Sequence, residues 1–262
     1  MGNPTSSRLS IVRGMHLLSE KVYARDLMPY GATDFDAGGC RARGPTLGAA
    51  MVLLIALVLG GCMQATLNPV SDANFTARDK QQLTNPPYQQ AWIPPAYQRQ
   101  VVQYHRKEAP GSILVDTDGR YVYYVLPEGR AIRYGAIVGE NGLAWSGVAT
   151  VGRKEEWPGW TPTEGEKRRL GPLPNYVEGG AHNPMGARAL YLYAGGKDTL
   201  YRIHGTNQPG WIGHAISSGC IRLTNEDVID LHSRVKIGAG VVVLGPKQGG
   251  PRIASAAGSQ PN

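Results

Sequence analysis

The sequence predicts a mainly β fold with one short helix, and three observations support this prediction. Gly (35 residues) and Pro (19 residues) are abundant while Leu, Val, Ile and Tyr stay plentiful between them, a mixture typical of short strands joined by many turns. Two runs rich in β-branched and aromatic residues, 112–116 and 121–126, flank Thr117-Asp118-Gly119, which indicates a β-hairpin. One helix start signal is clear, at Thr224.

Residues 1–61 are interpreted as a leader. The uncharged apolar run at 47–61 follows a basic flank and is shorter than the roughly 20 residues of a membrane-spanning helix, which is typical of a signal peptide. A buried core helix is the alternative. Leu59-Gly60-Gly61-Cys62 resembles a bacterial lipobox. This resemblance implies that Cys62 is lipidated and begins the mature chain, and Met63 after it favours sorting to the outer membrane.

The segment 62–99 is predicted to be a tether, because its Pro, Gln and Asn content is unable to bury a core. Docking is expected where Trp92, Ile93 and Tyr97 meet the domain. The tail at 247–262 is predicted to be flexible.

The folded domain is predicted at 100–246. Beyond the hairpin, strands are expected between Gly-rich turns, at 131–138, 189–194, 199–203, 220–223 and 241–244. Thr224 is the predicted N-cap of the helix, with Asp227 three residues on. The stretch 153–188 holds many prolines and no periodic pattern. A loop of that length inside a domain is usually functional, so we expect it to cover the active site.

The chain has three cysteines, Cys40, Cys62 and Cys220. If the leader is removed and Cys62 is lipidated, Cys220 is unpaired in an oxidising compartment, where a thiol is a liability unless it has a use. A small buried hydrophobic role is the alternative. The net charge of +7 favours acidic partners, but no dense basic run with interleaved aromatic residues indicates nucleic-acid binding.

His204 ends one predicted strand and Cys220 begins another, so the Gly- and Pro-rich loop between them can bring the two side chains together. An adjacent imidazole takes the proton of a thiol, and we expect a thiol pKa below the roughly 8.5 of a free Cys. Backbone N–H groups of Ser218, Gly219 and Cys220 are candidates for an oxyanion site. Arg222 faces the same side as Cys220 and suits a carboxylate or the thiolate.

This segment resembles the L,D-transpeptidase family with the YkuD domain, and more closely its ErfK-like members. The matching residues are His204-Gly205-Thr206-Asn207, Ile212-Gly213, Ser217 and Gly219-Cys220-Ile221-Arg222-Leu223, followed by Asn225-Glu226-Asp227. Cys220 lies 16 positions after His204, as in that family. Ser218 stands where several relatives carry His, Lys or Gln, which leaves substrate preference open.

The resemblance implies a β-sandwich catalytic domain without metal or organic cofactor. It implies Cys220 as nucleophile and His204 as general base. Oxyanion and substrate positioning would then fall to Gly205, Ser217, Ser218, Gly219 and Arg222. The implied reaction is acyl transfer from the third residue of a peptidoglycan tetrapeptide stem, with loss of the terminal D-Ala.

Two alternatives concern the site. His214 is a rival base, although its position is variable in the family. A zinc site built from His182, His204, His214 and Cys220 is conceivable, but no short His-x-x-x-His or Cys-x-x-Cys pair supports it.

Three functions stay open. A transpeptidase passes the thioester to an amine on another stem or on an outer-membrane protein, whereas an L,D-carboxypeptidase or hydrolase passes it to water. A non-catalytic wall-binding lipoprotein would not need the two residues. A papain-like protease does not fit, because there the Cys precedes the His. The expected location is the periplasm, lipid-anchored, with the outer membrane favoured.

Overall fold

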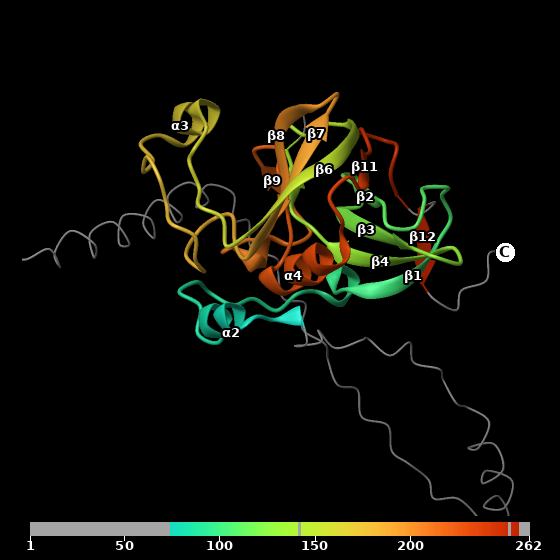
Figure 1. Cartoon of the computed structure of the whole chain (residues 1–262), viewed down its shortest axis with the longest axis horizontal. Helices are drawn as coiled ribbons and strands as arrows, with labels where there is room; N and C mark the ends of the chain where they lie inside the picture. Colours follow the sequence, from blue (N-terminus) through green and yellow to red (C-terminus); the bar gives the residue numbers. More distant parts are fainter. Residues whose placement is uncertain (1–73, 141–142, 251–252, 257–262) are drawn as a thin grey trace, which may run out of the picture. The chain divides into compact units, whose positions relative to one another are not determined.

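The structure is a computed structural model, and it describes residues 74–140, 143–250 and 253–256. Within these ranges the strands form a ten-stranded sheet of order β10-β8-β7-β6-β11-β2-β3-β4-β1-β12 and a two-stranded sheet of β5 and β9. The strands are β1 Gln100–Tyr104, β2 Ile113–Asp116, β3 Tyr121–Leu126, β4 Arg130–Gly135, β5 Val138–Gly139, β6 Gly147–Glu156, β7 Arg188–Ala194, β8 Lys197–His204, β9 Ala215–Ser217, β10 Ile221–Arg222, β11 Gly240–Val243 and β12 Ala254–Ala256. The large sheet is curled (Figure 1). Strands are the main regular structure of the described chain, which confirms the prediction of a mainly β fold.

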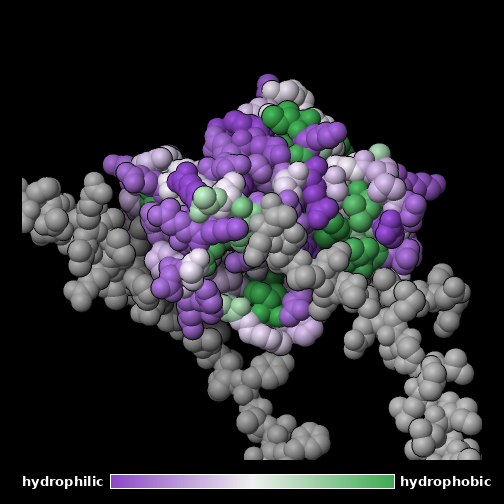
Figure 2. Space-filling view, turned by 60° about the horizontal axis from the view of Figure 1, so that its bottom comes forward, coloured by the Kyte–Doolittle hydropathy of each residue, from purple (hydrophilic) through white to green (hydrophobic). Residues whose placement is uncertain are grey.

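Three α-helices accompany these strands in the described ranges: α2 Ala77–Leu83, α3 Glu164–Leu170 and α4 Asn225–Arg234. Two short 3₁₀ helices, η2 Pro95–Tyr97 and η3 Pro209–Trp211, complete the set. No helix in this part of the chain is long and apolar enough to cross a membrane. The face drawn in Figure 2 is mostly hydrophilic, with scattered apolar areas.

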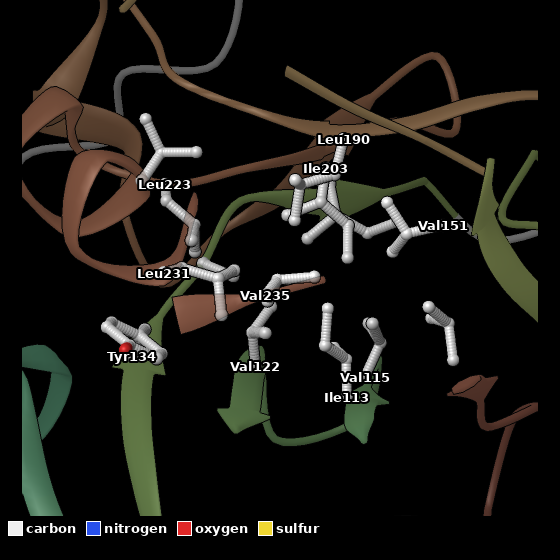
Figure 3. Packing of buried hydrophobic residues seen from close by; sticks show 14 of the residues in the cluster. Ile113, Val115, Val122, Tyr134, Val151, Leu190, Ile203, Leu223, Leu231 and Val235 are labelled. Atoms are coloured by element: carbon white, nitrogen blue, oxygen red, sulfur yellow. The ribbon is translucent and has the colours of Figure 1, made fainter. Parts of the chain in front are cut away.

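The main core lies between the two halves of the curled sheet. Ile113, Val115 and Val122 of β2 and β3 face Leu190 and Ile203 of β7 and β8 (Figure 3). Helix α4 closes one side of this cluster with Val228, Leu231 and the following Val235. Full burial of each such side chain contributes about 1.5–3 kcal/mol to the stability of the fold. Because Ile203 of β8 and Ile221 of β10 belong to this core, it fixes the positions of these two strands.

The predicted hairpin and helix start are both present. The buried Asp116 accepts a hydrogen bond from Gly119 N at 2.9 Å, which closes the turn between β2 and β3. Thr224 Oγ1 accepts from Asp227 N at 3.2 Å, which caps α4. These elements were predictable because their signals are local.

Strand β6 differs from the sequence expectation, which placed a loop from residue 153. Its second half, Arg153 to Glu156, pairs with β7. The charged residues there suit an exposed strand face, and pairing with β7 overrides their weak strand propensity. The remaining loop contains α3, whose Thr163 and Glu166 form a reciprocal capping box.

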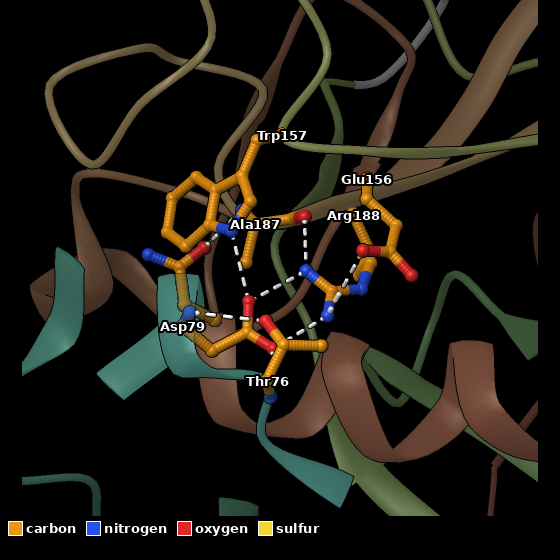
Figure 4. Close-up of polar contacts among 7 residues, drawn as sticks. Thr76, Asp79, Glu156, Trp157, Ala187 and Arg188 are labelled. Atoms are coloured by element: carbon orange, nitrogen blue, oxygen red, sulfur yellow. Dashed lines mark hydrogen bonds and ion pairs between the residues drawn. The ribbon is translucent and has the colours of Figure 1, made fainter. Parts of the chain in front are cut away.

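The described part of the predicted tether is packed rather than loose. Asp79 of α2 is fully buried and receives Arg188 Nη1 and Nη2 at 2.8 and 2.6 Å and Trp157 Nε1 at 2.8 Å (Figure 4). Tyr97 docks as expected, with its ring 5.3 Å from that of Tyr121, whereas Trp92 is exposed. The composition of this segment did not predict its packing, because the partner of Asp79 and the core on which Phe75 and Leu83 pack both belong to distant parts of the chain.

The described part of the predicted flexible tail is also attached. Gly250 N donates to Asp116 Oδ2 at 3.1 Å, Ile253 is buried, and β12 pairs with β1. The leader, Cys40 and Cys62 lie outside the described residues, and the domain boundaries 100–246 stay a prediction.

Candidate functional site

The chain brings His204 and Cys220 to neighbouring strands. β8 and β10 are parallel, with Ile221 opposite Ile203 and Arg222 opposite His204. Residues paired in register point to the same face of a sheet, and so do residues two apart. Arg202, His204 and Arg222 therefore share one face, and the Cys220 thiol reaches it through a hydrogen bond with the Arg202 backbone.

His204 is buried, and backbone hydrogen bonds with Gly205 and Met185 hold its ring. Nδ1 lies 2.7 Å from the Gly205 carbonyl oxygen, and a carbonyl only accepts, so Nδ1 is assigned the proton and Nε2 is unprotonated in the neutral ring. Burial, helped by the positive charge of Arg222, lowers the pKa of His204 to about 3. The imidazole is thus neutral near pH 7.

Cys220 as a whole residue is half-buried, but its thiol is buried, and this burial raises the thiol pKa. The Arg202 backbone and the charges of Arg222 and Arg202 oppose this rise without reversing it. The expectation of a depressed thiol pKa is therefore wrong for the free protein. No hydrogen bond joins Cys220 to His204 in the described ranges, so the resting pair is a neutral thiol and a neutral imidazole.

Ser217 holds the turn that carries Cys220. Its buried hydroxyl donates to the Cys220 carbonyl oxygen at 2.5 Å and accepts from Gly219 N at 3.2 Å. The Gly219 N–H is therefore engaged, which leaves the N–H groups of Ser218 and Cys220 as candidates for an oxyanion site.

Gly219 needs to be glycine at this turn. Its φ is +125°, and a Cβ there would lie 2.5 Å from Tyr201 Cε1 and 2.7 Å from the Leu143 carbonyl oxygen. The Tyr201 ring stacks on Trp145 with centroids 5.8 Å apart. The turn thus packs against the Tyr201 ring, and a side chain at position 219 would displace that ring.

The long loop reaches this turn through α3. The Arg169 guanidinium donates to the Ser218 hydroxyl, and Lys167 and Arg168 precede it on the same helix. On the strand side, Arg222 Nε is buried without a hydrogen-bond partner in the described chain. Positively charged side chains thus gather at this turn, although Lys167 is paired with Glu164 and Arg202 with Asp198, and such a cluster suits an acidic substrate.

The remaining predicted site residues are placed as follows. Gly205 orients the His204 ring through its carbonyl. His214 is exposed and packs against Trp211, and His182 is exposed with its carbonyl bound by Asn207 Nδ2. Among the described residues, no group of three His, Cys, Asp or Glu side chains could hold a metal ion, so the zinc alternative gains no support.

Two residues of the site were not singled out from the sequence. Arg202 was predictable, because it lies two positions before His204 in a strand and must share its face. Arg169 was not, since only the folded loop brings it to Ser218.

Comparisons with known proteins agree with this site. A family model described as the L,D-transpeptidase catalytic domain, YkuD, matches residues 110–243. The protein named Probable L,D-transpeptidase ErfK/SrfK from Escherichia coli K12 is 34% identical over 186 residues, which cover 68% of this chain and 53% of that protein. Probable L,D-transpeptidase YbiS from the same strain is 38% identical over 143 residues, 50% of this chain and 43% of that protein. The chain thus spans about half the length of these curated relatives.

A solved structure described as a probable carnitine operon oxidoreductase caia from Brucella melitensis is 46% identical. The match covers 58% of this chain and 96% of that chain, with a TM-score of 0.39. A superposition this loose supports no argument about function.

Proposed function

Because the chain belongs to the YkuD family of L,D-transpeptidase catalytic domains, we propose that it transfers peptidoglycan stem peptides through a thioester on Cys220. The observation that carries the proposal is the buried, neutral His204, whose unprotonated Nε2 lies on the strand beside Cys220 and under the charges of Arg202 and Arg222. A neutral base beside a thiol is the arrangement that nucleophilic acyl transfer needs.

The proposed reaction has two stages, acylation of Cys220 and transfer of the acyl group to an acceptor amine. His204 Nε2 takes the thiol proton as Cys220 Sγ attacks the carbonyl carbon before the terminal D-Ala. The carbon–nitrogen bond then breaks, and the imidazolium returns the proton to the leaving amine. An acceptor amine attacks the thioester, gives its proton to His204, and Sγ leaves and is reprotonated.

The protonation states of the free protein imply that proton transfer from Cys220 to His204 accompanies attack on the substrate. Because the thiol pKa is raised and the imidazole pKa is low, the thiolate and imidazolium form only as attack proceeds. Ser218 and Cys220 N–H groups are the proposed oxyanion donors, while Ser217, Gly205 and Gly219 keep the turn and the ring in position. Arg222, with Arg169 at Ser218, is proposed to bind the donor carboxylates.

A β-lactam that acylates thiolates tests the nucleophile. Incubation with a carbapenem should add the mass of the drug to the wild-type protein, and Cys220→Ala should show no adduct. His204→Ala should slow adduct formation by orders of magnitude with the fold intact, because groups acting as one unit lose together. His214→Ala, the matched histidine control, should react like wild type. An equal adduct on Cys220→Ala, or none on any variant, contradicts the assignment.

Hydrolysis is the second candidate, because water can take the place of the acceptor amine at the same thioester. Mass spectrometry of products from a disaccharide tetrapeptide separates the two. A cross-linked dimer indicates transfer, and a tripeptide alone indicates an L,D-carboxypeptidase.

We further propose a periplasmic location with the chain anchored through a lipid on Cys62, the outer membrane being favoured. This rests on the order of basic flank, apolar run and Leu-Gly-Gly-Cys in the sequence. An outer-membrane protein is then within reach as an acceptor, in addition to a second stem.

A further inference from the structure

The side chain of Asn225 joins the two chain segments around the catalytic histidine. Asn225 is buried at the first position of α4. Its Oδ1 accepts from Ala187 N at 2.8 Å, and its Nδ2 donates to the Thr206 carbonyl oxygen at 3.0 Å. Thr206 follows Gly205, whose own carbonyl holds the His204 ring.

Two glycines make room for this amide. A Cβ on Gly186 would lie 2.2 Å from Asn225 Oδ1, and a Cβ on Gly205 would lie 2.3 Å from it. The amide is therefore packed against the backbone on both sides. Any displacement of Asn225 moves the Gly205 and Thr206 peptides, and with them the acceptor of His204 Nδ1.

Tyr88 supplies the last hydrogen bond of this amide. The second Nδ2 hydrogen of Asn225 is donated to the Tyr88 hydroxyl at 3.0 Å. Tyr88 follows α2, outside the residues matched by the family model. Its segment is fixed by the ion pair of Asp79 with Arg188 and by Gln82 Oε1, which accepts from Ala181 N at 2.9 Å.

We propose that Tyr88 is a positioning residue for the catalytic base, acting through Asn225 on the Gly205 carbonyl that orients His204. The inference rests on His204 being the base, as proposed above. Without the hydroxyl, one buried Nδ2 hydrogen has no partner, and a buried unsatisfied donor favours rearrangement of the amide. The upstream segment is then part of the catalytic unit.

Tyr88→Phe removes one oxygen and is the direct test. The matched control is Tyr124→Phe, which removes a hydroxyl that donates to the Arg234 carbonyl oxygen at the other end of α4. The first measurement is carbapenem acylation, split into the affinity of the initial complex and the rate constant of adduct formation. The second is the ¹⁵N spectrum of the His204 ring, which reports its tautomer in the free protein.

We expect Tyr88→Phe to reduce the acylation rate constant by about threefold to tenfold, the equivalent of one neutral hydrogen bond, with unchanged initial affinity. The Nδ1–H tautomer signal of His204 should weaken in the same variant. Asn225→Asp, which keeps an acceptor for Ala187 N but loses both donors, should show a larger effect of the same kind. Tyr124→Phe should match wild type in both measurements.

The inference is overturned if Tyr88→Phe and Asn225→Asp, both folded by thermal melt, keep the wild-type tautomer signal and acylation rate. A wild-type protein that forms no adduct would instead contradict the proposed function. The ring tautomer still reports on positioning in that case, so the two failures are distinguishable.

Discussion

At the residue scale, burial and charge act on Cys220 in opposite directions. Burial raises the thiol pKa, and the Arg202 backbone with the charges of Arg222 and Arg202 pulls it down. His204 contributes no charge at rest, because its pKa is about 3. The Cys220 thiol is therefore protonated in the free protein near neutral pH, and a protonated thiol is less readily oxidised than a thiolate.

Alkylation of Cys220 should follow this balance. The rate of iodoacetamide reaction should rise with pH through a midpoint above the roughly 8.5 of a free Cys. Arg222→Gln should move the midpoint higher, since it removes a positive charge that favours the thiolate. Arg130→Gln, at an exposed arginine paired with Glu128, serves as control. A midpoint below that of a free Cys would show that burial does not dominate, and a midpoint unaffected by Arg222→Gln would show that the Arg222 charge does not act on the thiol.

At the element scale, α2 is held by a buried ion pair together with the partly buried Leu83, which packs against the main core. Asp79 and Arg188 are both buried, and each loses its hydration on folding. A buried ion pair contributes little net stability, but removing one partner leaves an uncompensated charge inside the protein. The pair therefore makes attachment of this helix close to all-or-none.

Asp79→Ala should lower the free energy of unfolding by about 3–5 kcal/mol, measured by urea denaturation. Lys80→Ala, at an exposed position of the same helix, should change it by less than about 0.5 kcal/mol. The double variant Asp79→Leu/Arg188→Leu should recover much of the loss, because no buried charge is left. A small effect of Asp79→Ala would mean that water compensates Arg188.

At the scale of the whole molecule, the contacts of the site that the structure describes lie within residues 76–225. Cys62 lies outside the described residues, and none of these contacts depends on it. Loss of the anchor should therefore change location and not chemistry.

Cys62→Ser should abolish incorporation of labelled fatty acid into the protein in cells, and the variant should move to the soluble fraction. The purified variant should still form a carbapenem adduct on Cys220. Cys40→Ser, at the other leader cysteine, should leave labelling unchanged. Labelling that survives Cys62→Ser, or a mature chain that retains residues 47–61, contradicts the anchor.

The sequence by itself determined the elements with local signals: the Asp116–Gly119 turn, the Thr224 cap, the strand that ends at His204 and the short strand that directly follows Cys220. The alternation of side chains along an extended chain also predicts that Arg222 lies on the same side as Cys220. These features depend on neighbours a few residues away, so a single sequence contains them.

Only the tertiary structure decided the second half of β6, the docking of α2 and the contact of Arg169 with Ser218. It also reversed the expected direction of the Cys220 pKa. Strand pairing, desolvation and charge proximity depend on groups that are distant along the chain. Asp79 and Arg188 are separated by 109 positions, and no local pattern in the sequence marks either one as the partner of the other.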